Sequence, residues 1–360
     1  MNRVSAVKII GSIGLVISML LNGCTTNSIT DDNVSGNDLT ATEVIRLMGN
    51  GINLGNTLEA YNHKSYVELG VDPTSFETLW GQPVTTRDMI DDMKAMGFDT
   101  LRIPVAWTNG INYESGDYTI DERLMNRVDE VVNYALDADM YVILNEHWDG
   151  SWWGMFGSAD EAVREKGMAL YKSMWTQISE HFSDYSYKLI FESANEELCH
   201  RLNDSDVTGT EGVLSEDECY ETTNRINSEF VKLVRSTGGK NADRFLLIAG
   251  YNTDFRKTCD DRYQMPEDTA KDKLLLSVHY YTPWDYCSDG NAKRWGTPGD
   301  YEEQNSLFQM LTKFTDRGYG VVIGEYAVMG AANKPDRDKF YANLLDNCDL
   351  YNYCLLYTSD

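Results

Sequence analysis

The chain has 360 residues, of which 42% are hydrophobic, so it can bury the core of one large domain or of two ordinary ones. Its formal net charge of −26 excludes nucleic acid as a partner and disfavours acidic polymers, because the chain would repel a polyanion. A neutral polymer rich in hydroxyl groups fits better, since the faces of the 22 Tyr and 8 Trp can stack on sugar rings.

The first residues have the pattern of an export signal. Arg3 and Lys8 precede an uncharged run over 9–23, which is shorter than the ~20 residues that a membrane-spanning helix needs. The segment ending in Gly23-Cys24 resembles the lipobox of bacterial lipoproteins, which implies cleavage before Cys24 and lipidation of that cysteine. We therefore predict a lipoprotein signal peptide over 1–23 and a secreted protein that is lipid-anchored at the bacterial cell surface or outer envelope. Secretion without a lipid and an uncleaved membrane anchor are the alternatives.

Residues 24–42 are rich in Thr, Asn, Ser and Asp, which predicts a flexible tether. The six cysteines beyond it have two interpretations. Export permits disulfides, and Cys199–Cys219 or Cys259–Cys287 could close loops of modest length. Buried free thiols are the other interpretation, and a zinc site is disfavoured because the chain has no Cys-x-x-Cys.

From residue 50 onward, apolar runs of strand length alternate with segments of helical apolar spacing. The strand runs are almost continuously apolar, as expected of parallel strands that are buried on both faces. This alternation predicts a (β/α)8 TIM barrel over 43–353, with a doubly wound open sheet as the alternative. The strand candidates are Ile52–Thr57, Thr100–Trp107, Tyr141–His147, Lys188–Asn195, Phe245–Tyr251, Leu274–Tyr281 and Val321–Tyr326. The helix candidates are Thr86–Met96, Asp121–Ala138, Glu161–Phe182, Thr222–Ser236, Glu302–Arg317 and Asp336–Leu345.

An eighth strand is not evident in this pattern. The chain closes with the heptapeptide 354–360, which matches what a common sequencing-library transposon adapter encodes in one frame. We therefore expect residues 354–360 to be non-native read-through, and the barrel to be truncated before its eighth strand and helix. Such a barrel would expose sheet edges and fold poorly. A short native strand at Leu355–Thr358 is the alternative, and the reading frame of the source gene decides between them.

Polar residues stand at the carboxyl ends of the candidate strands, where a barrel of this type carries its catalytic groups. Charged groups at the ends of buried strands are costly unless they are paired, so their recurrence indicates a site. In chain order these residues are Asn53, Asn56, Arg102, Asn145, Glu146, His147, Trp148, Asn195, Glu196, Glu197, His279, Tyr280, Tyr281, Glu325 and Tyr326.

Seven stretches resemble glycoside hydrolase family 5, and specifically its subfamily 4 of endoglucanases and xyloglucanases. They are GINLGNTLEA, ETLWGQPVTTRDMI, GFDTLRIPVAW, VILNEHWDG, LIFESANEEL, SVHYY and VVIGEY, in the family's order over about 50–326. The resemblance implies seven of the family's eight characteristic active-site positions, namely Arg102, His147, Asn195, Glu196, His279, Tyr281 and Glu325. The eighth position is a tryptophan on the last strand, and this sequence has none there.

The chemistry of retaining hydrolysis assigns roles to two of these residues. It needs two carboxyl groups about 5–5.5 Å apart, one ionised to attack the anomeric carbon and one protonated to donate to the leaving oxygen. We predict Glu325 as the nucleophile, because Arg102 and the Tyr281 hydroxyl lower its pKa. We predict Glu196 as the acid/base residue, initially neutral because the charge of Glu325 raises its pKa.

The remaining site residues are expected to bind and orient. Asn195 is placed to hydrogen-bond the sugar's 2-hydroxyl, while His147 and His279 orient the carboxylates and Asn53 supports the substrate site. Three further glutamates, Glu146, Glu192 and Glu197, are assigned no acid/base role. Asp149 is expected to cap a helix or a turn, and His63, His181 and His200 are expected to be surface or loop residues.

Aromatic residues near the strand ends are candidates for sugar platforms or for core packing. They are Trp80, Trp107, Trp148, Trp152, Trp153 and Trp284, of which Trp80 and Trp148 are the favoured platforms. Trp148 stands where the resemblance implies a second histidine, which suggests altered contacts on the non-reducing side.

We therefore predict a monomeric endo-β-1,4-glucanase, a cellulase-type glycosidase, that acts on neutral β-glucan without metal or cofactor. No histidine pair has metal-ligand spacing such as His-x-x-x-His. A xyloglucanase, lichenase, xylanase or mannanase on the same scaffold is the alternative within the enzyme class, because subsite loops decide that specificity. The alternative from another class is a non-catalytic glycan-binding surface lipoprotein, although binding alone does not require two strand-end glutamates.

Overall fold

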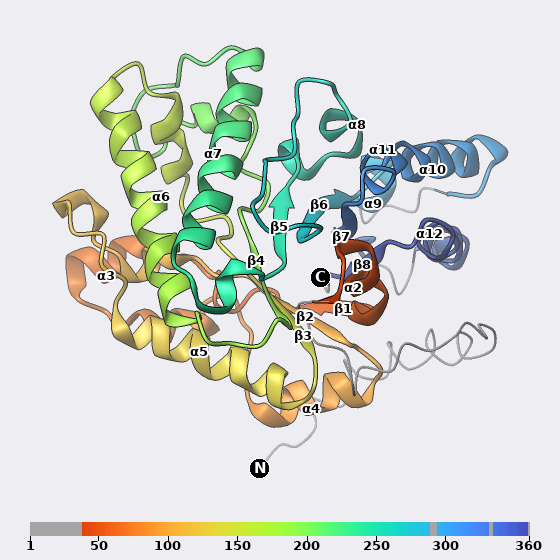
Figure 1. Cartoon of the computed structure of the whole chain (residues 1–360), viewed down its shortest axis with the longest axis horizontal. Helices are drawn as coiled ribbons and strands as arrows, with labels where there is room; N and C mark the ends of the chain where they lie inside the picture. The colour runs from red at the N-terminus through yellow and green to blue at the C-terminus, as the bar shows by residue number, and fades with distance from the viewer. Residues whose placement is uncertain (1–37, 289–293, 331–333, 359–360) are drawn as a thin grey trace.

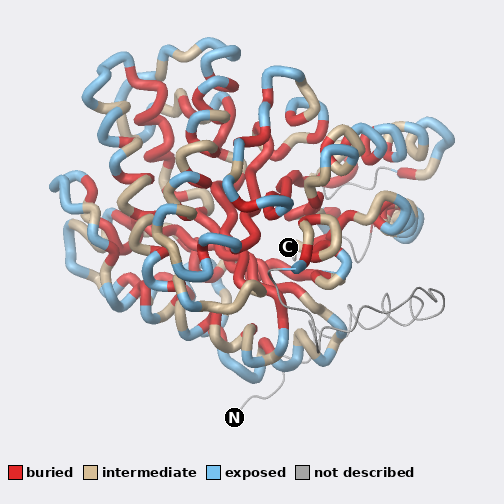
Figure 2. The backbone as a smooth tube through the Cα atoms, viewed as in Figure 1, coloured by how far each residue is buried: buried red, intermediate tan, exposed pale blue. Residues whose placement is uncertain are grey.

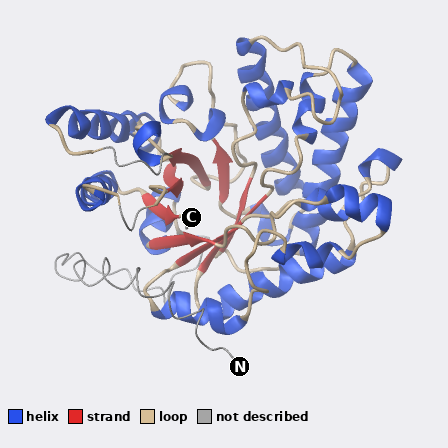
Figure 3. Ribbon diagram, turned by 180° about the vertical axis from the view of Figure 1, so that it is seen from behind, coloured by secondary structure: helices blue, strands red, loops and turns tan. Residues whose placement is uncertain are grey.

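The structure is a computed structural model that describes residues 38–288, 294–330 and 334–358. Within these ranges, parallel strands close into a barrel in chain order from β1 to β8, and helices surround it (Figures 1 and 3). This confirms the predicted (β/α)8 architecture. The strands are β1 (Asn50–Asn53), β2 (Thr100–Ile103), β3 (Tyr141–Asn145), β4 (Leu189–Glu192), β5 (Leu246–Ala249), β6 (Leu274–Tyr280), β7 (Gly320–Tyr326) and β8 (Cys354–Tyr357).

The predicted helices are present with shifted ends, because capping residues rather than apolar spacing set their first turns. Ser215 forms a capping box with Glu218, so the helix predicted from Thr222 begins at Glu216. Thr297 likewise caps a helix that begins at Pro298. The helices are α2 (Ala41–Met48), α3 (His63–Leu69), α4 (Arg87–Ala95), α5 (Glu122–Asp137), α6 (Glu161–His181), α7 (Glu216–Ser236), α8 (Phe255–Thr258), α9 (Trp284–Cys287), α10 (Pro298–Met310), α11 (Thr312–Thr315) and α12 (Arg337–Tyr351).

The expected truncation before an eighth strand is wrong, because β8 closes the barrel. It pairs in parallel with β7 through Val322↔Cys354 and with β1 through Gly51↔Leu356. The strand fits because Leu356 fills the space above Gly51, where an added Cβ would lie 1.9 Å from the leucine Cδ2. Closure on both sides leaves no open sheet edge at this point, so the expected edge exposure is absent.

Helix α2 covers the amino-terminal end of the barrel and was not predicted. Thr40 and Glu43 form a capping box that starts it, so the predicted tether ends two residues too late. Its residues Val44, Ile45 and Met48 join a core with barrel residues from six strands, including Leu247 and Leu356. Figure 2 shows buried backbone, drawn in red, gathered at the centre of the molecule. The barrel is therefore closed at this end and carries its open site at the other.

The predicted export signal lies outside the described residues, whereas the six cysteines after residue 42 lie within them. The signal peptide over 1–23, Cys24 and most of the tether lie outside the described residues. Among the residues that the structure describes, no helix combines the length and apolar character needed to cross a membrane. The six described cysteines are free thiols and five of them are buried, which agrees with the thiol interpretation rather than the two disulfides.

Candidate active site

The carboxyl ends of the strands bring the predicted site residues together. Asn53 ends β1, Arg102 lies in β2, and His147 follows β3. Asn195 and Glu196 follow β4, while His279 and Tyr281 come from the end of β6 and Glu325 from the end of β7. All belong to one face of the barrel, as the sequence predicts.

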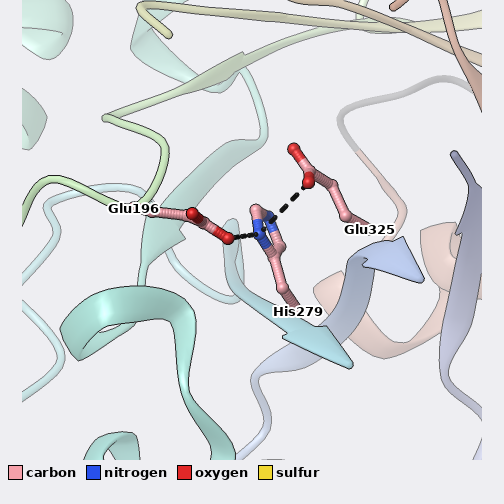
Figure 4. Close-up of side chains that lie close together, drawn as sticks. All are labelled: Glu196, His279 and Glu325. Carbon is pink, nitrogen blue, oxygen red and sulfur yellow. Dashed lines mark hydrogen bonds and ion pairs between the residues drawn. The ribbon is translucent and has the colours of Figure 1, made fainter. Parts of the chain in front are cut away.

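The two predicted catalytic glutamates face each other across His279 (Figure 4). One oxygen of Glu196, one oxygen of Glu325 and a ring nitrogen of His279 all lie within 4.8 Å of one another. Such a separation fits an enzyme that forms a covalent glycosyl intermediate, whereas inverting enzymes hold their carboxyl groups about 6.5–9.5 Å apart to admit water.

Arg102 is fully buried and connects four side chains of the site. Its Nη1 donates to Glu325 Oε1 and to Asn53 Oδ1, both at 2.9 Å, and its Nη2 donates to Asn195 Oδ1 at 2.8 Å. Its Nε donates to Glu192 Oε2 at 2.7 Å. One guanidinium therefore fixes Glu325 and both asparagines in a single rigid fork.

Sequence reasoning set Glu192 aside, yet it holds Arg102 in place. Glu192 is fully buried, and its second oxygen accepts from Ser277 Oγ at 2.7 Å. The signal was present in the sequence, since an acidic residue inside the apolar run of β4 requires a buried partner. Arg102 is that partner, so Glu192 supports the site without acting as acid or base.

The environment of Glu325 keeps it ionised. Burial alone would raise the pKa of Glu325, but the charges of His279 and Arg102 hold it below its ordinary value. Tyr281 Oη donates to Glu325 Oε2 at 2.9 Å, which further stabilises the carboxylate. The expected roles of Arg102 and Tyr281 toward Glu325 agree with these contacts.

The environment of Glu196 differs from the sequence expectation. We expected the charge of Glu325 to raise the pKa of Glu196, but that pKa lies below its ordinary value. Burial opposes this, and the hydrogen bond from His279 Nδ1 to Glu196 Oε1, at 2.9 Å, outweighs it. Arg201, whose Nη2 lies 3.9 Å from Glu196 Oε2, acts in the same direction. His279 stands between the two carboxylates, and their charges raise its own pKa despite its burial.

His147 is a neutral neighbour of this group. Burial, together with the charge of Arg102, lowers the pKa of His147 to about 3. Its Nδ1 lies 3.2 Å from Asn145 Nδ2, so Nδ1 accepts and the ring proton is on Nε2. His147 can therefore donate Nε2–H to a hydroxyl oxygen without adding charge.

A bulge in β7 aims Glu325 into the site. The register with β6 runs from Val278↔Ile323 to His279↔Glu325 and so passes over Gly324. A side chain at Gly324 would place its Cβ 3.1 Å from His279 Nε2 and 3.0 Å from Ser277 Oγ. A side chain here would therefore be tight against both residues, and glycine favours the close approach of His279 to this strand.

A cavity of about 450 Å³ opens beside Glu325. Its lining joins loops after several strands and consists of Asn53, Gly55, Asn56, Glu59, Trp80, Pro104, His147, Trp148, Glu325 and Thr358. Thr358 directly follows β8, the strand on which the resemblance implies a tryptophan. Sequence reasoning missed Glu59, whose carboxylate accepts from the backbone N–H groups of Asn56 and Thr57. Burial raises the pKa of Glu59 to about 7.

The structure separates the candidate platforms into surface and core residues. The favoured Trp80 and Trp148 both line the cavity, and Trp80 is 45% exposed. Trp284 is also exposed, with its ring edge-on to Tyr281 at 6.5 Å between centroids. The others, Trp107, Trp152 and Trp153, are fully buried and cannot stack on a polymer without rearrangement.

The expectation for His63 is wrong, and the expectation that Asp149 caps a turn is confirmed. His63 was expected to be a surface or loop residue but is buried, whereas His181 and His200 are exposed as expected. Asp149 does cap a turn, since its Oδ2 accepts from Thr108 N at 2.8 Å, but it is fully buried and comes from a distant loop. Burial raises the pKa of Asp149 to about 6.

Glu146 and Glu197 are buried and lie behind the site. Burial raises the pKa of Glu197 to about 8 and that of Glu146 well above its ordinary value. Among the residues that the structure describes, both oxygens of Glu197 and Oε2 of Glu146 have no hydrogen-bond partner. Burial therefore favours the neutral form of both groups.

One group of described side chains has the residue types and spacing of metal ligands, and it is the set Glu196, His279 and Glu325 itself. The Nδ1 atom of His279 is already bonded to Glu196 and lies 3.7 Å from Glu325 Oε2. A proton at Nδ1 therefore joins these two carboxylates.

The chain is similar in sequence and in structure to known glycoside hydrolases. Residues 64–355 match the family model described as Cellulase (glycosyl hydrolase family 5). Endoglucanase A of Paenibacillus barcinonensis is 34% identical over 328 residues, covering 83% of this chain and 75% of that protein. A xyloglucan-specific endo-β-1,4-glucanase of Bacteroides ovatus is 34% identical over 311 residues, covering 83% of this chain and 59% of that protein. A solved GH5-4 broad specificity endoglucanase from Ruminococcus champanellensis, with bound cellotriose, has a TM-score of 0.76 and 32% identity over 89% of this chain and 90% of its own.

Proposed function

Since this chain belongs to the cellulase family, glycosyl hydrolase family 5, we propose that its endo-β-1,4-glucanase activity proceeds by double displacement at Glu325 and Glu196. Glu325 attacks the anomeric carbon, and Glu196 protonates the leaving oxygen and later activates water. The product retains the anomeric configuration of the cleaved linkage. The observation that carries this proposal is the approach of the two carboxyl groups to within 4.8 Å, with Arg102 bonded to only one of them.

The proton for the first step starts on His279. In the free enzyme the charges of the two carboxylates favour the imidazolium form of His279, whose Nδ1–H donates to Glu196. When the leaving oxygen arrives, the Nδ1 proton passes to the Glu196 carboxyl, and His279 is left as a neutral imidazole with its proton on Nε2. Glu196 then delivers the transferred proton as the glycosidic bond breaks. Esterification of Glu325 then removes one negative charge, and Glu196 accepts a proton from the attacking water.

The substrate is held by groups that lie beside Glu325. Asn195 is fixed by Arg102 through its Oδ1, which leaves its amide N–H groups for the 2-hydroxyl of the sugar. Trp80 and Trp148 offer apolar faces for sugar rings in the cavity, and His147 offers Nε2–H. We assign a β-1,4-glucan to this cavity, and branched xyloglucan is the competing substrate because a relative with that specificity matches most of the chain.

Product stereochemistry tests the mechanism. We expect proton NMR of the first products from a soluble β-glucan to show the β-anomer before mutarotation, and an initial α-anomer would contradict double displacement. Glu325→Ala should abolish hydrolysis and, with azide as external nucleophile, yield an α-glycosyl azide. A panel of carboxymethylcellulose, xyloglucan, mixed-linkage glucan, xylan and mannan identifies the preferred polymer. Binding of these polymers without turnover would instead favour a glycan-binding lipoprotein.

We also propose that the protein is exported and lipid-anchored through Cys24. The support is the basic start, the short apolar run over 9–23 and the lipobox-like segment that ends in this cysteine. Mass spectrometry of the protein expressed in a bacterium with its leader should find a lipid-modified Cys24 at the mature N-terminus. Cys24→Ser should release the enzyme from the membrane fraction, and unchanged membrane retention would contradict the anchor.

A further inference from the structure

His63 is a buried histidine outside the catalytic group, and the mechanism above does not use it. It is the first residue of α3 and is 4% exposed. Its Nδ1 lies 2.6 Å from the carbonyl oxygen of Thr108, in the short helix η4 (Trp107–Gly110). Its Nε2 lies 2.9 and 3.0 Å from the two carboxylate oxygens of Glu114, in η5 (Tyr113–Ser115).

Both ring nitrogens of His63 face hydrogen-bond acceptors, namely the carbonyl oxygen of Thr108 and the carboxylate of Glu114. The His63 ring therefore bridges η4 and η5, and the side chain of Glu114 is 52% exposed. This contact clamps α3 to η4 and η5 with a charge-assisted hydrogen bond.

A row of aromatic rings continues from His63 to the cavity. The His63 ring stacks on Tyr113 at 4.7 Å between centroids and lies parallel to Tyr61 at 6.2 Å. Tyr61 meets Trp148 edge to face at 5.4 Å. The Tyr61 ring rests directly on Gly150, where an added Cβ would lie 2.0 Å from the tyrosine Cζ. The position of Tyr61 is therefore set by the rings and by this glycine.

Hydrogen bonds of Thr108 form a second connection between His63 and the segment that contains Trp148. Thr108, whose carbonyl accepts from His63, also donates its N–H and its hydroxyl to the buried carboxylate of Asp149. Asp149 directly follows Trp148 in the chain. The clamp at His63 thus reaches both the ring and the backbone of the Trp148 segment.

Trp148 and Glu325 both line the cavity, and Glu196 is not among its lining residues. If Glu325 attacks the anomeric carbon as proposed above, the sugar that bears this carbon borders the cavity, and the rings on its non-reducing side extend along Trp148. We propose that His63, clamped between Thr108 and Glu114, is a positioning residue that holds Trp148 as a platform for those non-reducing-side sugar rings. This inference rests on the proposed glucanase function.

Kinetics on aryl β-cellobioside and aryl β-cellotrioside test the proposal. His63→Phe keeps a flat ring but removes both hydrogen bonds, and it should raise KM by about three- to tenfold through misplacement of the aromatic row, with kcat little changed. Glu114→Ala leaves the buried ring in place and should raise KM by about two- to fivefold, as expected for a half-exposed ion pair. Glu68→Ala is the matched control, because Glu68 has a 59% exposed side chain and pairs with Lys64 on the same helix. Its KM should equal that of the wild type.

A double-mutant cycle separates positioning from a general loss of stability. In a Trp148→Ala background, His63→Phe and Glu114→Ala should add no further rise in KM, because the platform they position is gone. Additive losses, or an unchanged KM in Glu114→Ala, would overturn the proposal, and Glu114→Ala keeps the test decisive if His63→Phe does not fold. A wild-type enzyme that hydrolysed neither glycoside would contradict the proposed function instead, so the two failures are distinguishable.

Discussion

Arg102→Lys is the substitution whose outcome the structure defines in most detail. Lysine keeps a positive charge in the buried position, but a single ammonium cannot reach the four acceptors that the guanidinium fork serves. The shortest of the four contacts is the one to Glu192 at 2.7 Å, and both of those side chains are fully buried. We therefore expect the ammonium to stay with Glu192 and to give up Glu325.

The hydrogen bond that Glu325 loses sets the size of the expected fall in kcat/KM. A hydrogen bond to a charged group contributes about 1.5–3 kcal/mol, which corresponds to roughly a 10- to 150-fold fall in kcat/KM. The same energy is about one to two units in pKa. Because Arg102 lowers the pKa of Glu325, its removal raises that pKa, so the nucleophile is protonated over a wider acidic range. The acidic limb of the pH profile should move to higher pH by that amount.

The assay is the pH dependence of kcat/KM with an aryl β-cellobioside. Arg127→Lys is the control, because Arg127 also pairs with a buried glutamate, Glu77, but belongs to α5 outside the site. It should lower thermal stability and leave the acidic limb in place. An Arg102→Lys enzyme with an unshifted acidic limb would refute the electrostatic role of Arg102, even if its rate were reduced.

Three further predictions follow from the same structure. Glu196→Ala should lose activity on cellobiosides with poor leaving groups and retain the first step with dinitrophenyl leaving groups, and equal loss on both would contradict the acid role. Glu197→Gln should flatten the pH dependence of the free energy of unfolding. The pKa of Glu197 in the folded protein, about 8, lies above its ordinary value, so the wild type loses up to about 1.4 kcal/mol of stability per pH unit as the pH rises from the ordinary pKa to the folded one. The amide of glutamine does not titrate, so the variant does not show this loss. Urea unfolding at several pH values measures this, with Glu165→Gln, at an exposed position of α6, as control. Leu356→Ala should cost about 2–5 kcal/mol because Leu356 is fully buried in the barrel core, and a loss below 1 kcal/mol would contradict the closed barrel in solution.

Much of the fold and the central chemistry could be predicted from the sequence. The seven apolar runs correspond to β1–β7 because strands buried on both faces need continuous apolar residues. Polar residues at their carboxyl ends, including Arg102, Glu196 and Glu325, come together because parallel strands in a barrel present those ends on one face. Strand β8 was only the alternative to the truncation that we expected, since four residues carry too little pattern without their neighbours β1 and β7.

Which charged side chain pairs with which was, in contrast, decided by the tertiary structure. Glu192 and Glu196 are four residues apart, yet one anchors Arg102 and the other bonds His279, and no spacing in the sequence distinguishes those roles. The pKa of Glu196 lies below its ordinary value, whereas we expected it to be raised, because His279 stands between Glu196 and Glu325. Sequence pattern reports which residues are buried and which strand ends carry charge, because burial follows from local apolar periodicity. Which charge meets which partner depends on distances of a few ångströms between separate strands, and only the closed barrel fixes those distances.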